Sequence, residues 1–312
     1  MLWQFVQKVY QEKGRTETDG AVQALLKTPS LPSGLPEGVL EDLPEGPGVY
    51  LFYGENDIPL YVGKSVNLRS RVLSHFSGDH AASKDIRISQ KITRVDWIET
   101  AGELGALVQE AKLVKELAPA HNRQLRRNPD LCSYSYDPGG GEPKPRLVFA
   151  RDLDFAAMGN LYGLFRSKRE AVNTLRAIAD EQCLCPILLG LESGDGPCSS
   201  HQLKKCRGAC IGRESEKTHA ARLALALHRL HLKAWPFPGR VGVRETDPWS
   251  GRSELHVFDH WCYLGTVRSD WELLDSRDLR GELVFDLDTY KILTCYFERK
   301  GGKLAVVDLA RN

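Results

Sequence analysis

The sequence of 312 residues contains no apolar run long enough to cross a membrane, which takes about 20 consecutive apolar residues. Its first residues also lack the basic region, apolar stretch and small-residue cleavage site of a secretory signal peptide. An excess of one charge is missing as well, because 42 Lys and Arg face 41 Asp and Glu. These absences predict a cytoplasmic protein with no membrane partner, whose overall field does not steer it towards nucleic acid.

The local charge balance differs from the overall one. Between residues 61 and 127, twelve Lys and Arg face seven Asp and Glu. A nucleic-acid enzyme needs only such a local basic surface to meet phosphates. A solvated helix surface fits the same count, so charge alone does not decide between the two interpretations.

Cysteine is the second informative feature, because five of the eight cysteines fall within residues 183–210. In a cytosolic chain such clustering indicates a metal or cluster site before it indicates disulfides. The other three are isolated, and we expect no special role for Cys132, Cys262 and Cys295.

We predict four segments and find no internal repeat. Residues 1–42 should form two short amphipathic helices broken at Gly14 and Gly20, followed by an extended linker rich in Pro, Gly and Leu. The remaining segments are residues 43–129, the helical residues 130–235, which contain the cysteine cluster, and a C-terminal α+β or mostly β unit over residues 236–312. In the last segment, residues 282–285 and 290–298 are among the predicted strands.

The stretch from residue 48 to residue 71 organises the chain. Val49 to Tyr53 and Leu60 to Val62 are aromatic and β-branched, and a polar turn with Gly and Asn separates them, which indicates a β-hairpin. Asn67 can cap a following basic helix. A third strand is predicted at residues 92–98 and a helix at 102–117.

This order of elements resembles the GIY-YIG nuclease family, which implies that residues 43–129 are a nuclease domain and that the helical residues 130–235 bind DNA. The hairpin carries Gly48-Val49-Tyr50 and Tyr61-Val62-Gly63, and the residues in the family's further positions follow in the same order: Lys64, Arg71, Glu110 and Asn122. Each residue alone fits packing, a turn or a solvated surface. Packing does not demand all of them together. The resemblance implies an α+β fold with a small antiparallel sheet flanked by helices.

The resemblance also implies catalytic roles. Glu110 would hold Mg²⁺ or Mn²⁺, since a single carboxylate together with substrate phosphate suffices for such an ion. Tyr61 would be the general base, helped by the cations Lys64 and Arg71, which favour its phenolate. Arg71 would also bind the scissile phosphate.

Three further residues complete the expected catalytic set. Tyr50 would orient the water or Tyr61, and Asn122 belongs to the family pattern. His75 lies four residues after Arg71 on the same helix face, where UvrC-type nucleases often carry a tyrosine. The proton therefore goes either to Tyr61 or to His75.

The cysteine segment offers four thiolates for one site: Cys185, Cys198, Cys206 and Cys210. Four thiolates can hold tetrahedral Zn²⁺ or an iron–sulfur cluster, and the chemistry alone does not choose. The segment looks like that of UvrC, which implies a [4Fe–4S] cluster with Zn²⁺ as the alternative. Cys183 could replace Cys185 as the first ligand, although Cys185 fits the family spacing better.

Residues 42–235 resemble the Cho/UvrC group of nucleotide-excision repair nucleases. No second nuclease with a carboxylate triad and no UvrB-binding coiled segment is readable before Asn312. The resemblance therefore implies one 3′ incision in damaged double-stranded DNA presented by UvrA and UvrB. Two alternatives stay open: a nuclease outside excision repair, for example beside a proofreading exonuclease, and a non-catalytic DNA-binding adaptor.

Overall fold

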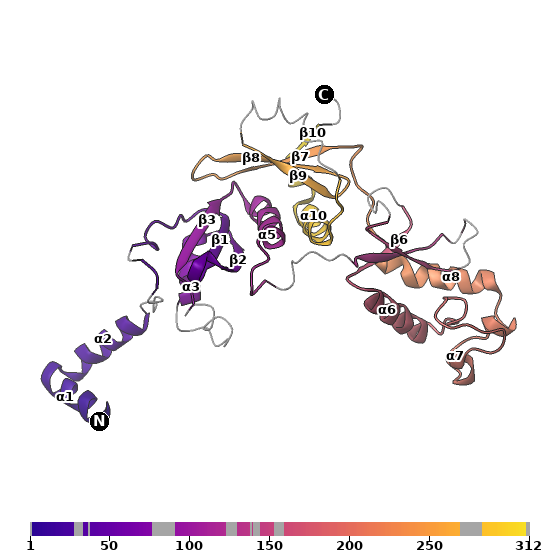
Figure 1. Ribbon diagram of the computed structural model, residues 1–312, viewed down its shortest axis with the longest axis horizontal. Coiled ribbons are helices and arrows are strands. Elements are labelled where there is room, and N and C mark those ends of the chain that lie inside the picture. Colours follow the sequence, from indigo (N-terminus) through magenta and orange to yellow (C-terminus); the bar gives the residue numbers. More distant parts are fainter. Residues whose placement is uncertain are drawn as a thin grey trace. The chain divides into compact units, whose positions relative to one another are not determined.

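The computed structural model describes residues 2–27, 34–36, 38–76, 91–122, 130–137, 139, 144–152, 159–268 and 283–309 (Figure 1). The chain forms two compact units. The first comprises Met1–Arg126, Arg244–His256 and Thr266–Leu274, and the second comprises Arg127–Val243, Val257–Gly265 and Asp275–Asn312. No helix among the described residues is long and apolar enough to span a bilayer.

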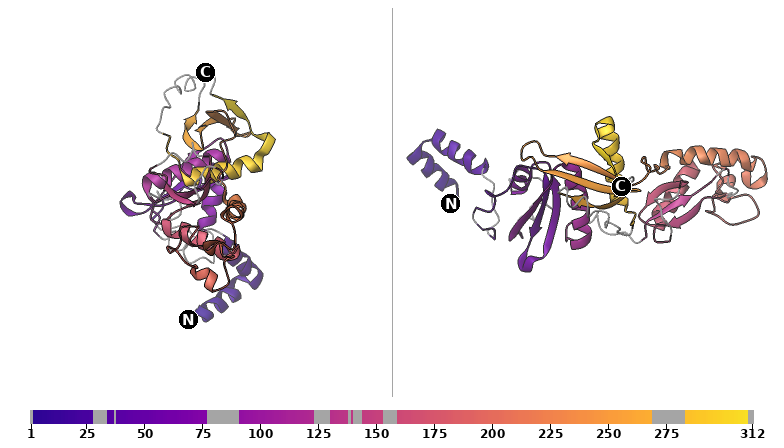
Figure 2. Two further views of the ribbon diagram at one scale, coloured as in Figure 1. Left: turned by 90° about the vertical axis from the view of Figure 1, so that its right-hand side faces the viewer. Right: turned by 90° about the horizontal axis from the view of Figure 1, so that it is seen from above.

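The N-terminal segment is a pair of helices, α1 (Leu2–Lys13) and α2 (Arg15–Lys27). They fold back on one another, as Figure 2 shows, and the Tyr10 hydroxyl donates to Asp19 Oδ1 at 2.7 Å. The predicted break at Gly14 is confirmed, because Gly14 has a φ of 80°. The predicted break at Gly20 is wrong, since α2 continues through it.

A three-stranded antiparallel sheet forms the centre of the first unit, in the order β2-β1-β3. Its strands are β1 (Gly48–Tyr53), β2 (Pro59–Ser65) and β3 (Arg94–Glu99). Helix α3 (Leu68–Phe76) packs on one face of the sheet, and α5 (Glu103–Leu117) packs on the other. The expected α+β class, with a small antiparallel sheet flanked by helices, is confirmed.

The alternation of side chains along β1 separates the two faces. Tyr50 and Phe52 pack with Leu68 and Val72 beneath α3, while Val49, Leu51 and their neighbours pack beneath α5. The predicted linker is only partly a linker: Leu40 and Leu43 are buried in the core on the α3 side. Residues 77–90 lie outside the described residues.

The second unit contains another antiparallel sheet, in the order β5-β4-β6. Its strands are β4 (Cys132–Ser135), β5 (Arg146–Phe149) and β6 (Leu161–Phe165). Helices α6 (Lys168–Glu181) and α8 (Glu216–Leu227) share a core with this sheet. The short α7 (Ser199–Gln202) lies in the cysteine segment between them.

The C-terminal sheet runs in the order β10-β7-β8-β9. Its strands are β7 (Val241–Thr246), β8 (Ser253–Asp259), β9 (Cys262–Val267) and β10 (Val306–Asp308). The strand predicted at residues 290–298 is wrong, because α10 (Leu287–Lys300) occupies that stretch. Residues 283–285 of the strand predicted at 282–285 have no regular structure, and residue 282 lies outside the described residues.

The error at α10 has a physical cause. Aromatic and β-branched residues suggest a strand, but Asp286 accepts a hydrogen bond from the Thr289 N–H at 2.9 Å and so caps a helix. Leu293 and Tyr296 are then buried on one face of that helix. Arg299 and Lys300 end the helix with positive charge, which favours the C-terminal end of its dipole.

Candidate active site and cysteine cluster

Gly63 is the residue that allows the rings of two tyrosines to lie close together on the sheet. It pairs with Tyr50 across the β1–β2 hairpin, and Tyr61 pairs with Phe52. The rings of Tyr50 and Tyr61 lie 6.0 Å apart. A Cβ at Gly63 would lie 2.4 Å from the Tyr50 hydroxyl and 2.7 Å from Tyr61 Cε1, so no larger residue fits there without displacing a ring.

Helix α3 adds a histidine and an arginine to the two tyrosines. Asn67 Oδ1 accepts from the Ser70 N–H at 2.8 Å and fixes the start of the helix. His75 Nε2 lies 2.8 Å from the Tyr50 hydroxyl oxygen, and its ring centre is 5.9 Å from that of Tyr61. Arg71 also hydrogen bonds to Tyr50.

The hydroxyl of Tyr50 is held in its protonated form. Burial is the main cause of its raised pKa, and Tyr61 and Glu110 raise the pKa further against the opposing effect of Arg71. An arginine can only donate, so the Tyr50 oxygen accepts from Arg71, and it also lies within hydrogen-bonding distance of His75 Nε2. A hydroxyl that stays protonated fits the orienting role expected of Tyr50.

Glu110 reaches the same region from α5, on the opposite face of the sheet. Burial raises the pKa of its carboxyl to about 7, although the charge and the backbone N–H of Lys64 act in the other direction. The carboxylate lies close enough to influence the pKa of Tyr50. The structure thus brings the acidic side chain and the two-tyrosine hairpin together.

This burial leads to a stability prediction. Ionising Glu110 costs free energy in the folded state, so the cost is absent below the carboxyl's ordinary pKa of 4.5 and complete above about 7. Glu110→Gln should therefore unfold at a higher urea concentration than wild type at pH 8.5. We expect its free energy of unfolding to exceed that of wild type by about 2 kcal/mol after allowing for solvent screening. At pH 5 the difference should fall below half of that. A difference in stability that does not change with pH would contradict the raised pKa of Glu110. The measurement is urea unfolding in the presence of EDTA.

Two further residues of the expected set, Lys64 and Asn122, belong to or contact the edge strand β2. Lys64 Nζ lies 3.8 Å from Glu103 Oε1, so Glu103 has a cationic neighbour and is only partly solvated. Asn122 is buried, accepts from the Val62 N–H at 2.9 Å and donates to the Val62 carbonyl at 2.7 Å. Both polar groups of the Asn122 amide thus face the backbone between Tyr61 and Gly63, which makes Asn122 a positioning residue.

The four expected cysteine ligands meet in the second unit. The sulfur atoms of Cys185, Cys198, Cys206 and Cys210 all lie within 4.8 Å of one another. Cys183, the alternative first ligand, is not in this group, which is the only such group among the described residues. Four sulfurs 2.3 Å from one Zn²⁺ lie about 3.8 Å apart, so this donor set can hold a metal centre.

Backbone N–H groups point at three of these sulfurs. Cys198 Sγ accepts from His201 N and Cys206 Sγ accepts from Gly208 N, both at 3.3 Å. Cys210 Sγ accepts from Cys198 N at 3.4 Å. Such N–H groups stabilise thiolate charge, which a metal centre requires.

Two structural supports were missed by the sequence reasoning. His219 on α8 is buried, and its Nε2 accepts from the Cys185 N–H at 2.9 Å, which fixes the first ligand. Burial lowers the pKa of His219, in keeping with a neutral acceptor. Glu245 on β7 contacts the start of α5 from 140 residues away. A lone histidine and a strand glutamate carry no motif, so nothing in the sequence pattern singles them out.

Three family models match the chain. A UvrC-like GIY-YIG domain matches residues 46–123, and the middle domain of UvrC/Cho excinucleases matches residues 131–229. The excinuclease Cho C-terminal domain matches residues 240–312. Together these matches cover both the hairpin with its acidic helix and the cysteine segment.

The chain is also similar to individual proteins. "Excinuclease cho" of Escherichia coli (strain K12) is 46% identical over 258 residues, covering 81% of this chain and 83% of that protein. "UvrABC system protein C" of Gemmatimonas aurantiaca is 35% identical over 186 residues, covering 58% of this chain and 30% of that protein. The GIY-YIG N-terminal endonuclease domain of UvrC from Thermotoga maritima, crystallised with magnesium, is 31% identical, covering 27% of this chain and 90% of that one with a TM-score of 0.25.

Proposed function

Because the chain belongs to the excinuclease Cho family and is a GIY-YIG endonuclease, we propose that it makes the 3′ incision of nucleotide-excision repair. In this proposal UvrA and UvrB present the damaged double-stranded DNA, and the chain cuts one strand once. The convergence of Tyr50, Tyr61, Arg71 and Glu110 in one electrostatically coupled group supports this assignment.

We infer that Glu110 binds a divalent cation, Mg²⁺ or Mn²⁺. The site fits such an ion because it offers a hard carboxylate oxygen, and the raised pKa shows that the buried charge lacks full compensation. When bound, the cation supplies positive charge to the phosphate and the leaving oxygen. The backbone N–H of Lys64 orients the carboxylate, and Lys64 Nζ adds a further positive charge nearby.

The arrangement of hydroxyls favours Tyr61 over His75 as the group that takes the water's proton. Tyr50 stays protonated, and its hydroxyl shares a hydrogen bond with His75 Nε2, so that nitrogen is already engaged. Tyr61 stands beside both residues, and the cationic Arg71 and Lys64 favour its phenolate. Arg71 is exposed on α3, where its planar guanidinium can also bind a phosphate.

We infer a structural metal centre on the four cysteines of the second unit. The family resemblance favours a [4Fe–4S] cluster, and the same donor set accepts Zn²⁺. Lys204, Lys205 and Arg207 are exposed next to the ligand Cys206, so the centre would hold a basic loop in a fixed shape for DNA phosphates.

The proposal is tested by mapping the cut on a duplex with a single lesion. We expect the pure protein with UvrA, UvrB, ATP and Mg²⁺ to produce one nick on the 3′ side of the lesion. EDTA should abolish the nick, because the charge on the phosphate is then left without its cation. The readout is a sequencing gel with each strand labelled in turn.

Omission and substrate controls separate the alternatives. The same duplex without the lesion, and the reaction without UvrB, should both stay intact. Equal cutting without UvrB would indicate a nuclease outside excision repair. Binding to DNA without any Mg²⁺-dependent cutting would indicate a non-catalytic adaptor.

A further inference from the structure

The helix that carries Glu110 lacks an N-cap of its own. Gly102 occupies the N-cap position of α5 and has no side chain to accept from the first-turn N–H groups. The first N–H groups of a helix have no partner within the helix and need an acceptor from elsewhere. A serine, threonine or aspartate normally supplies that acceptor to the second and third helical residues.

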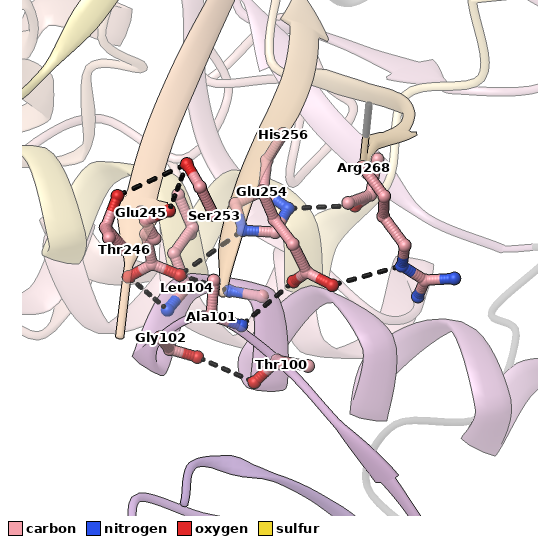
Figure 3. Close-up of polar contacts among 12 residues, drawn as sticks. Thr100, Ala101, Gly102, Leu104, Glu245, Thr246, Ser253, Glu254, His256 and Arg268 are labelled. Carbon is pink, nitrogen blue, oxygen red and sulfur yellow. Dashed lines mark hydrogen bonds and ion pairs between the residues drawn. The ribbon is translucent and has the colours of Figure 1, made fainter. Parts of the chain in front are cut away.

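Glu245 of strand β7 supplies the missing acceptor. Its Oε1 accepts from the Leu104 N–H at 3.0 Å, and its Oε2 accepts from the Gly105 N–H at 2.8 Å (Figure 3). These are the second and third residues of α5, the two that an N-cap side chain would satisfy. The Glu245 carboxylate is nearly buried, and its negative charge complements the positive end of the helix dipole.

Two glycines, Gly102 just before α5 and Gly105 in its first turn, make room for this approach. A Cβ at Gly102 would lie 2.4 Å from Glu245 Cδ, inside the space that the carboxylate fills. A Cβ at Gly105 would lie 2.8 Å from Cε1 of the buried His256, whose Nε2 is 3.3 Å from Glu245 Oε2. The absence of side chains at the start of α5 and the presence of Glu245 are therefore complementary.

Neighbouring residues of the β7–β8 hairpin hold the same connection. Glu254 on β8 is buried, accepts from the Ala101 N–H at 3.0 Å and pairs with Arg268 at 3.1 Å. His256 Nδ1 lies 2.8 Å from Thr266 Oγ1. The hairpin thus binds the backbone of the last residues before α5 as well as its first turn.

We propose that Glu245 is a positioning residue for the nuclease: as the N-cap of α5, it sets the place of the metal-binding Glu110 against β2. The proposal rests on the function assigned to Glu110 above. Gly105, whose N–H donates to Glu245, and Glu110 both lie on α5, about one and a half turns apart. Loss of the cap loosens the first turn, and the loosened turn shifts Glu110 from its hydrogen bond with the Lys64 backbone.

A pair of substitutions tests this without relying on DNA cleavage. Glu245→Ala removes the cap, and Gly102→Ser places a Cβ in the space of the Glu245 carboxylate. The double variant removes the carboxylate and gives the helix a serine N-cap in its place. Each protein is measured for Mn²⁺ binding by calorimetry and for hydrogen exchange of the amides at residues 103–106.

We expect each single variant to bind Mn²⁺ about tenfold more weakly, which corresponds to about 1.4 kcal/mol and to the loss of one N-cap. Leu104 and Gly105 should lose amide protection in Glu245→Ala. The double variant should recover affinity to within about threefold of wild type, since its serine restores the cap. Thr246→Ala, on the exposed side of the same strand, should match wild type.

Two results would overturn the proposal: wild-type Mn²⁺ affinity in Glu245→Ala, or a folded double variant that binds no better than Glu245→Ala. If Glu245→Ala fails to fold, Glu245→Gln, which keeps one acceptor oxygen, and the double variant still give the comparison. Absence of Mn²⁺ binding in Glu110→Gln identifies the signal as that of the catalytic site. Neither readout depends on DNA cleavage. If Glu245→Ala weakens Mn²⁺ binding but the wild-type protein leaves lesion-bearing DNA uncut, the proposed function is refuted and the positioning role of Glu245 stands.

Discussion

Glu110→Gln slows incision of lesion-bearing DNA by about a thousandfold, the rate equivalent of roughly 4 kcal/mol, while DNA affinity stays within about threefold. Glutamine keeps the size of the side chain and can still accept from the Lys64 N–H. It loses the negative charge that attracts a divalent cation. The expected result is therefore loss of kcat without loss of binding, measured by single-turnover nicking and by gel shift.

Glu103→Gln is the matched control for this prediction. Glu103 lies seven residues before Glu110 on the same helix and pairs with the same lysine, at 3.8 Å. Its pair with Lys64 is partly exposed, and such pairs contribute little. We expect the Glu103 variant to keep activity within about threefold of wild type. Full activity in Glu110→Gln, or equal losses in both variants, would remove Glu110 from the metal site.

Cys198→Ser empties the cysteine centre and destabilises the second unit by at least about 3 kcal/mol, because binding free energy at a structural metal site is folding free energy. The segment from Cys183 to Ser215 contains only α7 and one 3-10 turn (Ala209–Ile211). The interior around the sulfurs is built from the cysteines, Ala209 and two partly buried neighbours, Ile187 and Leu188. Leu184 and Leu189 fix the start of the segment in the core shared with α6 and α8, and the part that follows them depends most on a metal.

The substitution Cys198→Ser removes a metal-binding thiolate but keeps an N-cap for α7. Cys198 Sγ also accepts from the His201 N–H and caps α7, and serine is itself a good N-cap. Cys183→Ser is the control, since that sulfur lies outside the group of four. Metal content, labile sulfide and thermal unfolding are measured. Iron with sulfide identifies a cluster, and zinc identifies a single ion. Unchanged metal content and stability in Cys198→Ser would show that the four thiols do not hold a metal centre.

The hairpin and its partners were predictable because their constraints are local or belong to a known pattern. Gly63 illustrates this, since the two tyrosine rings leave no space for a Cβ and the glycine is visible in the sequence. Helix α5 was predicted from its apolar spacing, and the structure begins it one residue later, at Glu103. The cysteine spacing likewise predicted which four sulfurs meet.

The features that could not be predicted from the sequence depend on contacts between residues far apart in the chain. Strand β4 lies at the centre of its sheet, yet Cys132 to Ser135 is short and polar, and only its pairing with β5 and β6 makes it a strand. Helix α10 was mistaken for a strand because its residue types favour β-structure and its cap was overlooked. The contact of Glu245 with α5 joins residues 140 apart and has no local signature.

The placement of Glu245 also has a consequence during translation. At about 5–20 residues per second, the 140 residues between Gly105 and Glu245 take the ribosome roughly 7–28 seconds to add. Throughout that interval the nascent helix has its acidic side chain but no cap. A growing or prematurely terminated polypeptide would thus carry Glu110 on an uncapped helix and, like Glu245→Ala, would bind its cation about tenfold more weakly than the finished protein.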